Sequence, residues 1–313
     1  ALTSRNHTER IPIIIGISED QSNRLWIATA RDGVKVLNRE NGEIIHIAPD
    51  RRFPASLSSV YLNAIYTDRQ GIVWIGNMDN GLNLYVPNRN KFGIHHINSN
   101  GDFEKRYSVI WHFLETDEDN LYLATEGGLA KFLRNENRYR IYRIKEADAK
   151  TDADNRLKTL HMDHRGRIWV GTFREGLYNF DPETERFTRF RYPGKVNRRV
   201  YQANILWVEQ DRSGNYWISA FGLGLLKMDR DLTRVEQYLH HPGNHSSLGS
   251  DVCYAFSEDR KGRIWIGTLG MGLNLYNPEQ KDFKRYSNRP GDSSSINSNT
   301  VLSIANGKDG CLW

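Results

Sequence analysis

A large aromatic residue recurs along this chain at a nearly constant interval. Successive anchors are separated by 48, 48, 47, 48, 48 and 48 residues, and they are Trp26, Trp74, Tyr122, Trp169, Trp217, Trp265 and Trp313. Self-similarity at a fixed period of this length is the signature of a repeat architecture, in which each repeat buries its faces against its neighbours. The period therefore decides the fold class before any other feature does.

Each period contains the pattern of four strands joined by tight turns. An apolar strand precedes a turn, written Asp-x-x-Gly in four repeats, and the anchor strand follows, as in Trp265-Ile266-Gly267. Asp caps such a turn and Gly supplies the positive φ. A second Gly, seven residues after most anchors, leads into a third strand, and a fourth strand carries aromatics such as Phe283 and Tyr286. Four antiparallel strands in 48 residues are typical of one propeller blade.

The predicted fold class is therefore all-β, a β-propeller of four-stranded antiparallel blades with six complete repeats and a partial seventh. We expect a single propeller over residues 1–313, with blades at approximately 11–58, 59–106, 107–153, 154–201, 202–249 and 250–297 and a partial blade at 298–313. A propeller that ends in mid-blade is unfinished, so we expect the chain to be a fragment of a longer protein. How the seventh blade is completed stays open.

The anchors are expected to fill the spaces between blades, because large aromatic side chains dominate core burial. The third repeat departs from the pattern. It has Tyr122 in place of Trp, Thr116 at the position of the turn Asp, and no Gly in that turn. Its local geometry is therefore expected to differ from that of the other blades.

Composition excludes several other classes of protein. Hydrophobic residues make up 38% of the chain, and no apolar run is long enough to span a membrane. The net charge is +5, but Lys and Arg are interleaved with Asp and Glu, so we expect no nucleic-acid partner. Two cysteines, Cys253 and Cys311, are too few for a disulfide framework and are expected to be structural.

Two clusters resemble metal sites but fit turns better. The histidine-rich run at 240–245 aligns with 288–293 in the next repeat, where the same loop has no histidine. The turn aspartates lie in separate blades and cannot converge on one calcium ion; they are Asp68, Asp163, Asp211 and Asp259. We therefore predict no metal, no cofactor and no catalytic residue.

Two segments carry a resemblance to a known repeat. Residues 168–177 read IWVGTFREGL and residues 264–273 read IWIGTLGMGL. Both are similar to the two-component regulator propeller repeat, usually written W-I-G-T-x-x-x-G-L. The preceding Ser-Ser-Leu at 246–248 and Ser-Ser-Ile at 294–296 also resemble it. The likeness extends over six periods and nearly the whole chain.

The resemblance implies a function. In that family the propeller is the extracytoplasmic sensor half of bacterial membrane receptors, joined to a histidine kinase or a diguanylate cyclase. It implies a periplasmic module of an inner-membrane receptor that recognises an oligosaccharide or other small ligand and pairs with its own receptor chain as a homodimer. Contact with a membrane is expected only through segments downstream of this chain. The propeller itself is not expected to be an enzyme.

Loops that vary on a fixed scaffold suit recognition, and the loops expected on the channel face vary most between repeats. Aromatic rings there can stack on a sugar, and charged donors can bind hydroxyls or carboxylates. The candidate ligand-binding residues are Arg31, Asp79, Trp111, Arg156, Arg174, Glu175, Tyr201, Trp207, Phe221 and Met271.

The sequence is also compatible with two other functions. A protein-interaction scaffold would display an apolar patch on the loop face, made of Phe173, Phe221, Leu269 and Met271. A propeller lyase or hydrolase would place a histidine and an acidic residue over the channel, for which His112 and Glu126 are the best pair.

Overall fold

The computed structural model describes residues 13–50, 52, 56–79, 81–87, 91–95, 97, 107–116, 120–144, 155–194, 198–307 and 310–313. Its strands form six four-stranded sheets. Three sheets are built from β1 (Ile14–Glu19), β2 (Arg24–Thr29), β3 (Val34–Asn38), β4 (Ile44–Ile47), β5 (Leu62–Thr67), β6 (Val73–Asn77), β7 (Leu82–Val86), β8 (Lys91–His95), β9 (Ile110–Glu115), β10 (Asn120–Thr125), β11 (Gly128–Leu133) and β12 (Arg138–Tyr142). The other three are built from β13 (Leu157–Met162), β14 (Ile168–Thr172), β15 (Leu177–Asp181), β16 (Arg186–Arg189), β17 (Ile205–Gln210), β18 (Tyr216–Ala220), β19 (Leu225–Met228), β20 (Val235–Tyr238), β21 (Cys253–Glu258), β22 (Ile264–Thr268), β23 (Leu273–Asn277) and β24 (Asp282–Tyr286).

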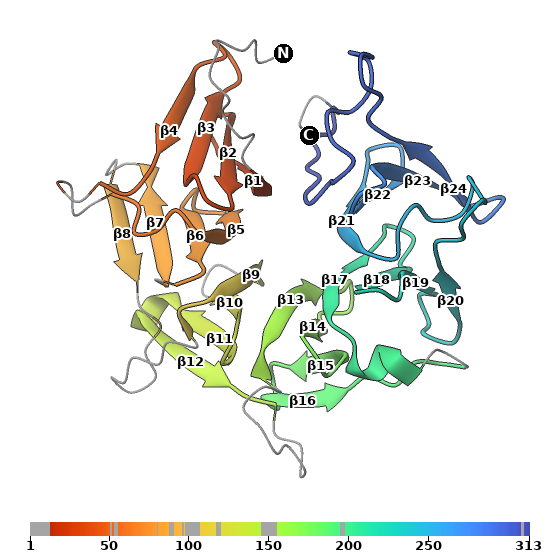
Figure 1. Cartoon of the computed structure of the whole chain (residues 1–313). Helices are drawn as coiled ribbons and strands as arrows, with labels where there is room; N and C mark the ends of the chain where they lie inside the picture. The colour runs from red at the N-terminus through yellow and green to blue at the C-terminus, as the bar shows by residue number, and fades with distance from the viewer. Residues whose placement is uncertain are drawn as a thin grey trace.

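The six sheets are the blades of a β-propeller, numbered 1 to 6 in chain order. Figure 1 shows them arranged around a central axis, with the first strand of each blade innermost and the fourth at the periphery. Neighbouring strands within each blade are antiparallel, as in blade 4, where β13 pairs with β14 and β14 with β15. Two short 3-10 helices, η3 (Arg134–Glu136) and η5 (Arg198–Gln202), lie between strands. The predicted all-β propeller is therefore confirmed.

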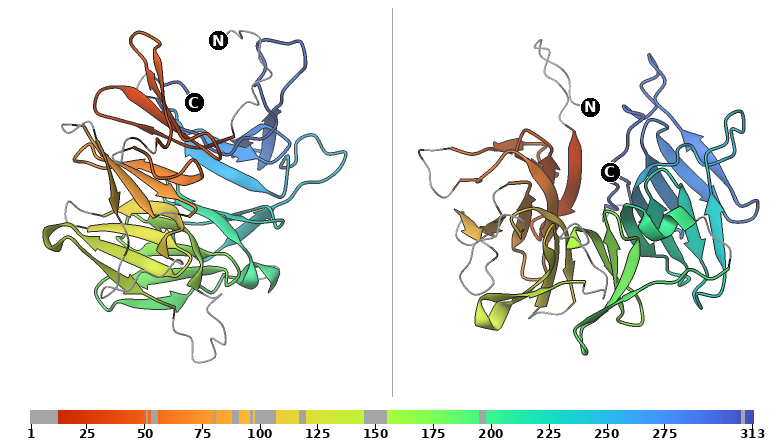
Figure 2. Two further views of the ribbon diagram at one scale, coloured as in Figure 1. Left: turned by 60° about the vertical axis from the view of Figure 1, so that its left-hand side comes forward. Right: turned by 60° about the horizontal axis from the view of Figure 1, so that its bottom comes forward.

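Residues of the seventh repeat form a short hairpin. Ala305 and Trp313 exchange two backbone hydrogen bonds of 2.9 Å, and Asn306 pairs with Leu312. In both views of Figure 2 the C-terminus lies between blade 1 and blade 6. The guanidinium carbon of Arg39, in blade 1, lies 5.5 Å from the centroid of the Trp313 ring. The hairpin therefore contacts the first blade as well as following the sixth.

Five of the seven anchor aromatics pack against the next blade, as expected, whereas Trp265 packs against Tyr286 of its own blade. Trp169 and Trp217 are fully buried. The ring of Trp169 lies 5.0 Å from that of Tyr216 in the next blade, and Trp217 lies 4.9 Å from Tyr276. The seventh anchor was predicted wrongly, because Trp313 is 44% exposed and lies in the hairpin instead of between two complete blades.

The turn aspartates do more than cap their turns. In blade 4, Oδ1 of Asp163 accepts the backbone N–H groups of Arg165 and Arg167, while Oδ2 accepts the indole N–H of Trp169 at 2.9 Å. The same indole bond recurs in blades 1, 2, 5 and 6. One carboxylate therefore holds both the turn and the anchor ring of its blade, and it satisfies a buried donor that would otherwise destabilise the fold.

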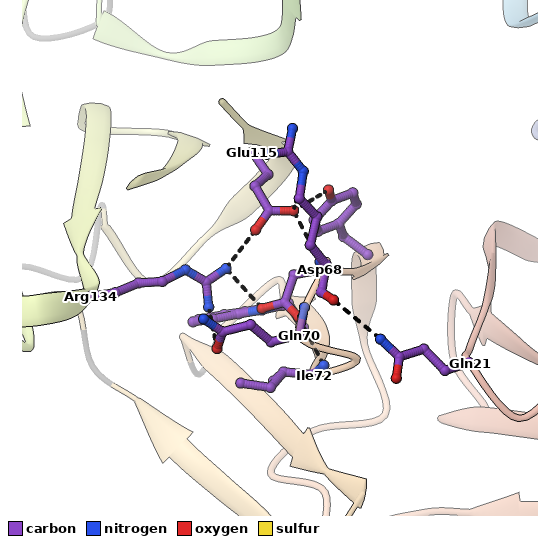
Figure 3. A network of polar contacts seen from close by, with 9 residues as sticks. Gln21, Asp68, Gln70, Ile72, Glu115 and Arg134 are labelled. Atoms are coloured by element: carbon purple, nitrogen blue, oxygen red, sulfur yellow. Dashed lines mark hydrogen bonds and ion pairs between the residues drawn. The ribbon is translucent and has the colours of Figure 1, made fainter. Parts of the chain in front are cut away.

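Blade 3 replaces this arrangement with a buried ionic network shared with blade 2 (Figure 3). The Arg134 guanidinium donates to Oδ2 of Asp68 at 2.8 Å and to Oε1 of Glu115 at 3.0 Å. The other oxygen of Glu115 accepts from the hydroxyl of Tyr66 at 3.0 Å. The Arg134 side chain is 9% exposed and the two carboxylates 1% or less. Blade 3 is thus linked to blade 2 by the ion pair between Arg134 and Asp68.

Candidate functional site

A channel with a volume of about 730 Å³ runs along the propeller axis. Every first strand contributes to its wall, and so do residues 302–304 of the seventh repeat. Concave sites at the mouths of closed β-architectures are where ligands bind most often. This wall is therefore the candidate site.

A β-bulge at the second position of every first strand directs one extra side chain. In blade 4, Leu157 pairs with Thr172 and Thr159 with Gly171, which leaves Lys158 unpaired between them. The same irregularity recurs in the other five blades. All six bulged residues line the channel: Ile15, Asn63, Trp111, Lys158, Leu206 and Tyr254. Bulges re-aim side chains near functional sites, and here they build a ring of channel-facing groups.

The wall is chemically asymmetric. The Lys, Glu and His side chains of the wall lie on blades 3, 4 and 5, the polar sector of the channel; they are Lys158, Glu209 and His112, and Asn204 lies in the same sector. The wall of blade 1 and of the seventh repeat is largely apolar, with Ile15, Ile17, Leu302 and Ile304. A polar sector opposite an apolar one fixes the orientation of whatever enters.

The mouth of the polar sector holds two aromatic rings and two cations. The ring centroids of Trp111 and Phe173 are 5.1 Å apart. The Nζ atom of Lys158 lies 3.5 Å from the Trp111 centroid and 5.4 Å from that of Phe173. The guanidinium carbon of Arg156 lies 5.3 Å from the Phe173 centroid. Burial lowers the pKa of Lys158 to about 7, while the charge of Glu126 opposes the shift.

His161 and Glu209 lie in contact across blades 4 and 5, and Glu209 lines the channel. The Nδ1 atom of His161 lies 3.0 Å from Oε2 of Glu209. Burial lowers the pKa of His112 from its ordinary value, against the charge of Glu209 and with those of His161 and Lys158. His112 is therefore a neutral imidazole at pH 7. The charges that act on it come from blades 4 and 5, whereas Glu126, its expected partner, acts on Lys158.

Several polar atoms of this sector are buried and have no hydrogen-bond partner within the described part of the chain. They are Nε1 of Trp111, Nδ1 of His112, Nε of Arg156, Nε2 of His161 and Oδ1 of Asn204. A buried donor or acceptor without a partner destabilises a fold by roughly 1–3 kcal/mol. Such atoms gathered on one wall favour a function for that wall over a purely structural role.

The channel mouth is formed by two sets of loops that share a face, as the sequence predicted. The N–H of Phe173, after β14, donates to the carbonyl of Arg156, before β13, at 3.0 Å. The N–H of Phe221 likewise donates to the carbonyl of Asn204 at 2.9 Å. These bonds tie each loop after a second strand to the entrance of the first strand in the same blade.

The structure brings together four of the ten predicted binding residues. Trp111, Trp207 and Phe221 line the channel, and Arg156 stacks beside Phe173 at its mouth. Trp207 is 7% exposed and donates its indole N–H to the carbonyl of Cys253.

The other six predicted residues lie outside the channel lining. Glu175 is paired with Arg189 at 2.6 Å, and the Tyr201 ring packs against Tyr192. The remaining four are exposed: Arg31, Asp79, Arg174 and Met271.

The pair His161 and Glu209 was missed in the sequence. A signal was present, because each residue lies eight positions before the anchor of its blade. They therefore occupy equivalent positions in successive repeats, and the packing of blade 4 against blade 5 brings them into contact. No group of three or more metal-binding side chains occurs among the residues that the structure describes. Within that same part of the chain no helix is long and apolar enough to cross a membrane.

Comparison with known proteins gave one family model and several structural neighbours. The two component regulator propeller model matches residues 56–79 and 247–270. No curated protein matches the chain. The extracellular domain of BT3049 from B. thetaiotaomicron, a protein named as a hybrid two component system, superposes with a TM-score of 0.78 at 17% identity over 99% of this chain. The corresponding domain of BT4673 from the same organism gives a TM-score of 0.73 at 15% identity over 96% of this chain.

This chain spans 40% and 36% of the lengths of those two structures. A virginiamycin B lyase from Staphylococcus aureus, solved with quinupristin, superposes with a TM-score of 0.68 at 11% identity, covering 96% of this chain and 91% of the lyase. At these identities the superpositions show the fold. The chain is therefore a six-bladed propeller, and two of its segments are similar to the two component regulator propeller model.

Proposed function

We propose that this propeller is an extracytoplasmic ligand-sensing module of a bacterial signal-transduction receptor, located in the periplasm, and that its ligand is carbohydrate-like. The repeat type and the likeness to extracellular domains of hybrid two component systems support the sensor role. The receptor passes its signal through a change in how two copies of its chain associate. Sedimentation velocity with and without ligand measures that association.

The observation that carries the ligand class is the polar sector of the channel. Trp111 and Phe173 line the channel, and aromatic rings stack on the apolar face of a sugar. Unpaired donors and an acceptor lie on the same wall and match the hydroxyl groups of a saccharide, since a hydroxyl both donates and accepts.

A thermal-shift screen against oligosaccharides of different charge and linkage tests this proposal. A ligand at a hundred times its dissociation constant stabilises the protein by about 2.7 kcal/mol. We expect the shift to be lost in Trp111→Ala and kept in Met271→Ala, a control on the same loop face outside the channel lining. Reducing-end and unsaturated-product assays on each hit should find the ligand intact. Breakdown of the ligand would instead support a lyase or hydrolase.

A protein-binding scaffold is the second candidate, because three apolar side chains of the loop face are exposed. Phe221 is 48% exposed, Leu269 42% and Met271 39%. Exposed apolar side chains that gather on one face mark sites of protein contact. A lack of response to every glycan, with binding to a receptor partner that Leu269→Ser abolishes, would favour this function.

A further inference from the structure

The mouth of the polar sector carries two cationic side chains, whereas a neutral sugar has no charged group for them to bind. Arg156 and Lys158 both lie near the ring of Phe173. The guanidinium carbon of Arg156 is 5.3 Å from the ring centroid, and Nζ of Lys158 is 5.4 Å from it. Within the described part of the chain neither cation forms an ion pair with a carboxylate.

Two of the unpaired buried atoms at this mouth are donors. They are Nε of Arg156 and Nε1 of Trp111. The Nζ atom of Lys158 lies over the Trp111 ring, 3.5 Å from its centroid. Donors without acceptors on a cationic wall match a group that only accepts, such as an ionised carboxylate or a sulfate.

We propose that Lys158 and Arg156, walled by Trp111 and Phe173, form a subsite for one anionic group, a carboxylate or a sulfate, on the ligand of this channel. The inference rests on the proposed ligand-binding function and narrows it to acidic ligands. The charge of the anion attracts both cations, and its oxygens accept from the unpaired donors. The rings exclude water from the pair and strengthen the attraction.

Anion binding is coupled to the protonation of Lys158. Its pKa is about 7 in the ligand-free channel, and a bound anion favours the ammonium form. Affinity should therefore be greatest below pH 7 and fall as pH rises above it. The other titratable or charged groups that face this part of the channel are His112, Glu126, Arg156, His161 and Glu209.

The test measures the reactivity of single lysines in the intact protein with acetic anhydride and mass spectrometry, across pH 5–10. The probes are sulfate, acetate and glucuronate, with glucose as the neutral match for glucuronate. We expect the anions to slow acylation of Lys158 at pH 7, about fivefold for a pKa rise of one unit, and glucose to leave it unchanged. Lys227 is the internal control, because its Nζ also lies over aromatic rings, 5.1 Å from Trp217, but on β19.

The outcomes separate this inference from the proposed function. Equal slowing by glucose and glucuronate would show a sugar site without acid recognition, which overturns the anion subsite and leaves the sensor proposal intact. No effect on Lys158 from any anion up to its solubility limit also overturns the subsite, whatever the glycan screen finds. In Lys158→Met the anion-dependent thermal shift should be lost, and in Lys227→Met it should persist.

Discussion

The indole N–H of Trp169 donates a 2.9 Å hydrogen bond to Oδ2 of Asp163, six residues earlier in the chain. Both side chains are buried, and the same bond forms in five of the six blades. It joins a turn outside the anchor strand to the ring that packs against the next blade. Local chain geometry and interblade packing are therefore held by one carboxylate per repeat.

Replacing that carboxylate should destabilise the propeller far more than replacing a surface one. Asp163→Ala leaves the indole N–H and two backbone N–H groups of the turn without their acceptor, so we expect a loss of about 3 kcal/mol. Urea unfolding followed by tryptophan fluorescence measures it. Asp181→Ala, in an exposed turn of the same blade, is the control and should change stability by less than about 1 kcal/mol. Equal losses would show that the indole bond contributes little.

These carboxylates also predict how acid unfolds the protein. Burial alone would raise the pKa of Asp259, but hydrogen bonds from Trp265, Arg263 and Lys261 outweigh it and lower the pKa to about 2. The pKa values of Asp20 and Asp163 are lowered in the same way. A group with a lowered folded-state pKa stabilises the fold above its unfolded value, near 4, and that stability is lost as pH falls.

Urea midpoints should therefore stay level from pH 7 to about pH 5 and fall steeply between about pH 4 and pH 2. In Asp259→Asn the fall should be shallower, because one of the titrating groups is gone. A midpoint that is unchanged at pH 2.5 would contradict the assigned role of the turn aspartates.

The buried network between blades 2 and 3 predicts a non-additive pair of substitutions. Arg134→Met leaves Glu115 and Asp68 without their cation, and removing one partner of a buried ion pair destabilises by roughly 3–5 kcal/mol. Adding Glu115→Gln should recover part of that loss, since one uncompensated charge disappears. A double-mutant cycle from urea unfolding measures the coupling. Additive losses would mean that the two side chains do not interact.

Close approach between blades predicts a strong contrast between two glycines. A Cβ at Gly171 would lie 2.5 Å from Cγ2 of Thr159 and 2.8 Å from Cγ2 of Ile205 in the next blade, whereas one at Gly93 would meet no atom within 4 Å. Gly171→Ala should destabilise by roughly 1–3 kcal/mol through overpacking, and Gly93→Ala should be tolerated. Thermal unfolding of both variants checks the difference. A tolerated Gly171→Ala would show that blades 4 and 5 can move apart.

Much of the architecture could be predicted because the repeat period and the turn residues are local signals. The predicted blade at 59–106 contains β5 to β8, and the irregular third repeat does differ locally. The corresponding turn of blade 1 does not match the Asp-x-x-Gly pattern, because it has no Gly at the fourth position. There Asp20 accepts from Trp26 while Asn23, with φ of 58°, takes the place of Gly.

The channel could be predicted only in part, because it depends on side chains from different blades and on bulges that leave no mark in composition. Loop variability pointed to the correct face and to Trp111, Arg156 and Phe221, but it also selected Glu175, which is paired with Arg189. Arg134 gave no signal, since its partner Asp68 lies 66 residues earlier. Contacts between residues of different blades can be recognised only once the arrangement of the blades is known.

Hydrogen exchange of the propeller, with and without the best ligand from the glycan screen, tests whether the ligand binds in the channel. We expect protection in the segments that carry the polar sector, at β9, at β13 and in the loop after β14, with no change in β1 to β4 outside the channel. Protection confined to the outer strands, or none in blades 3 to 5 at saturating ligand, would contradict the channel as the binding site.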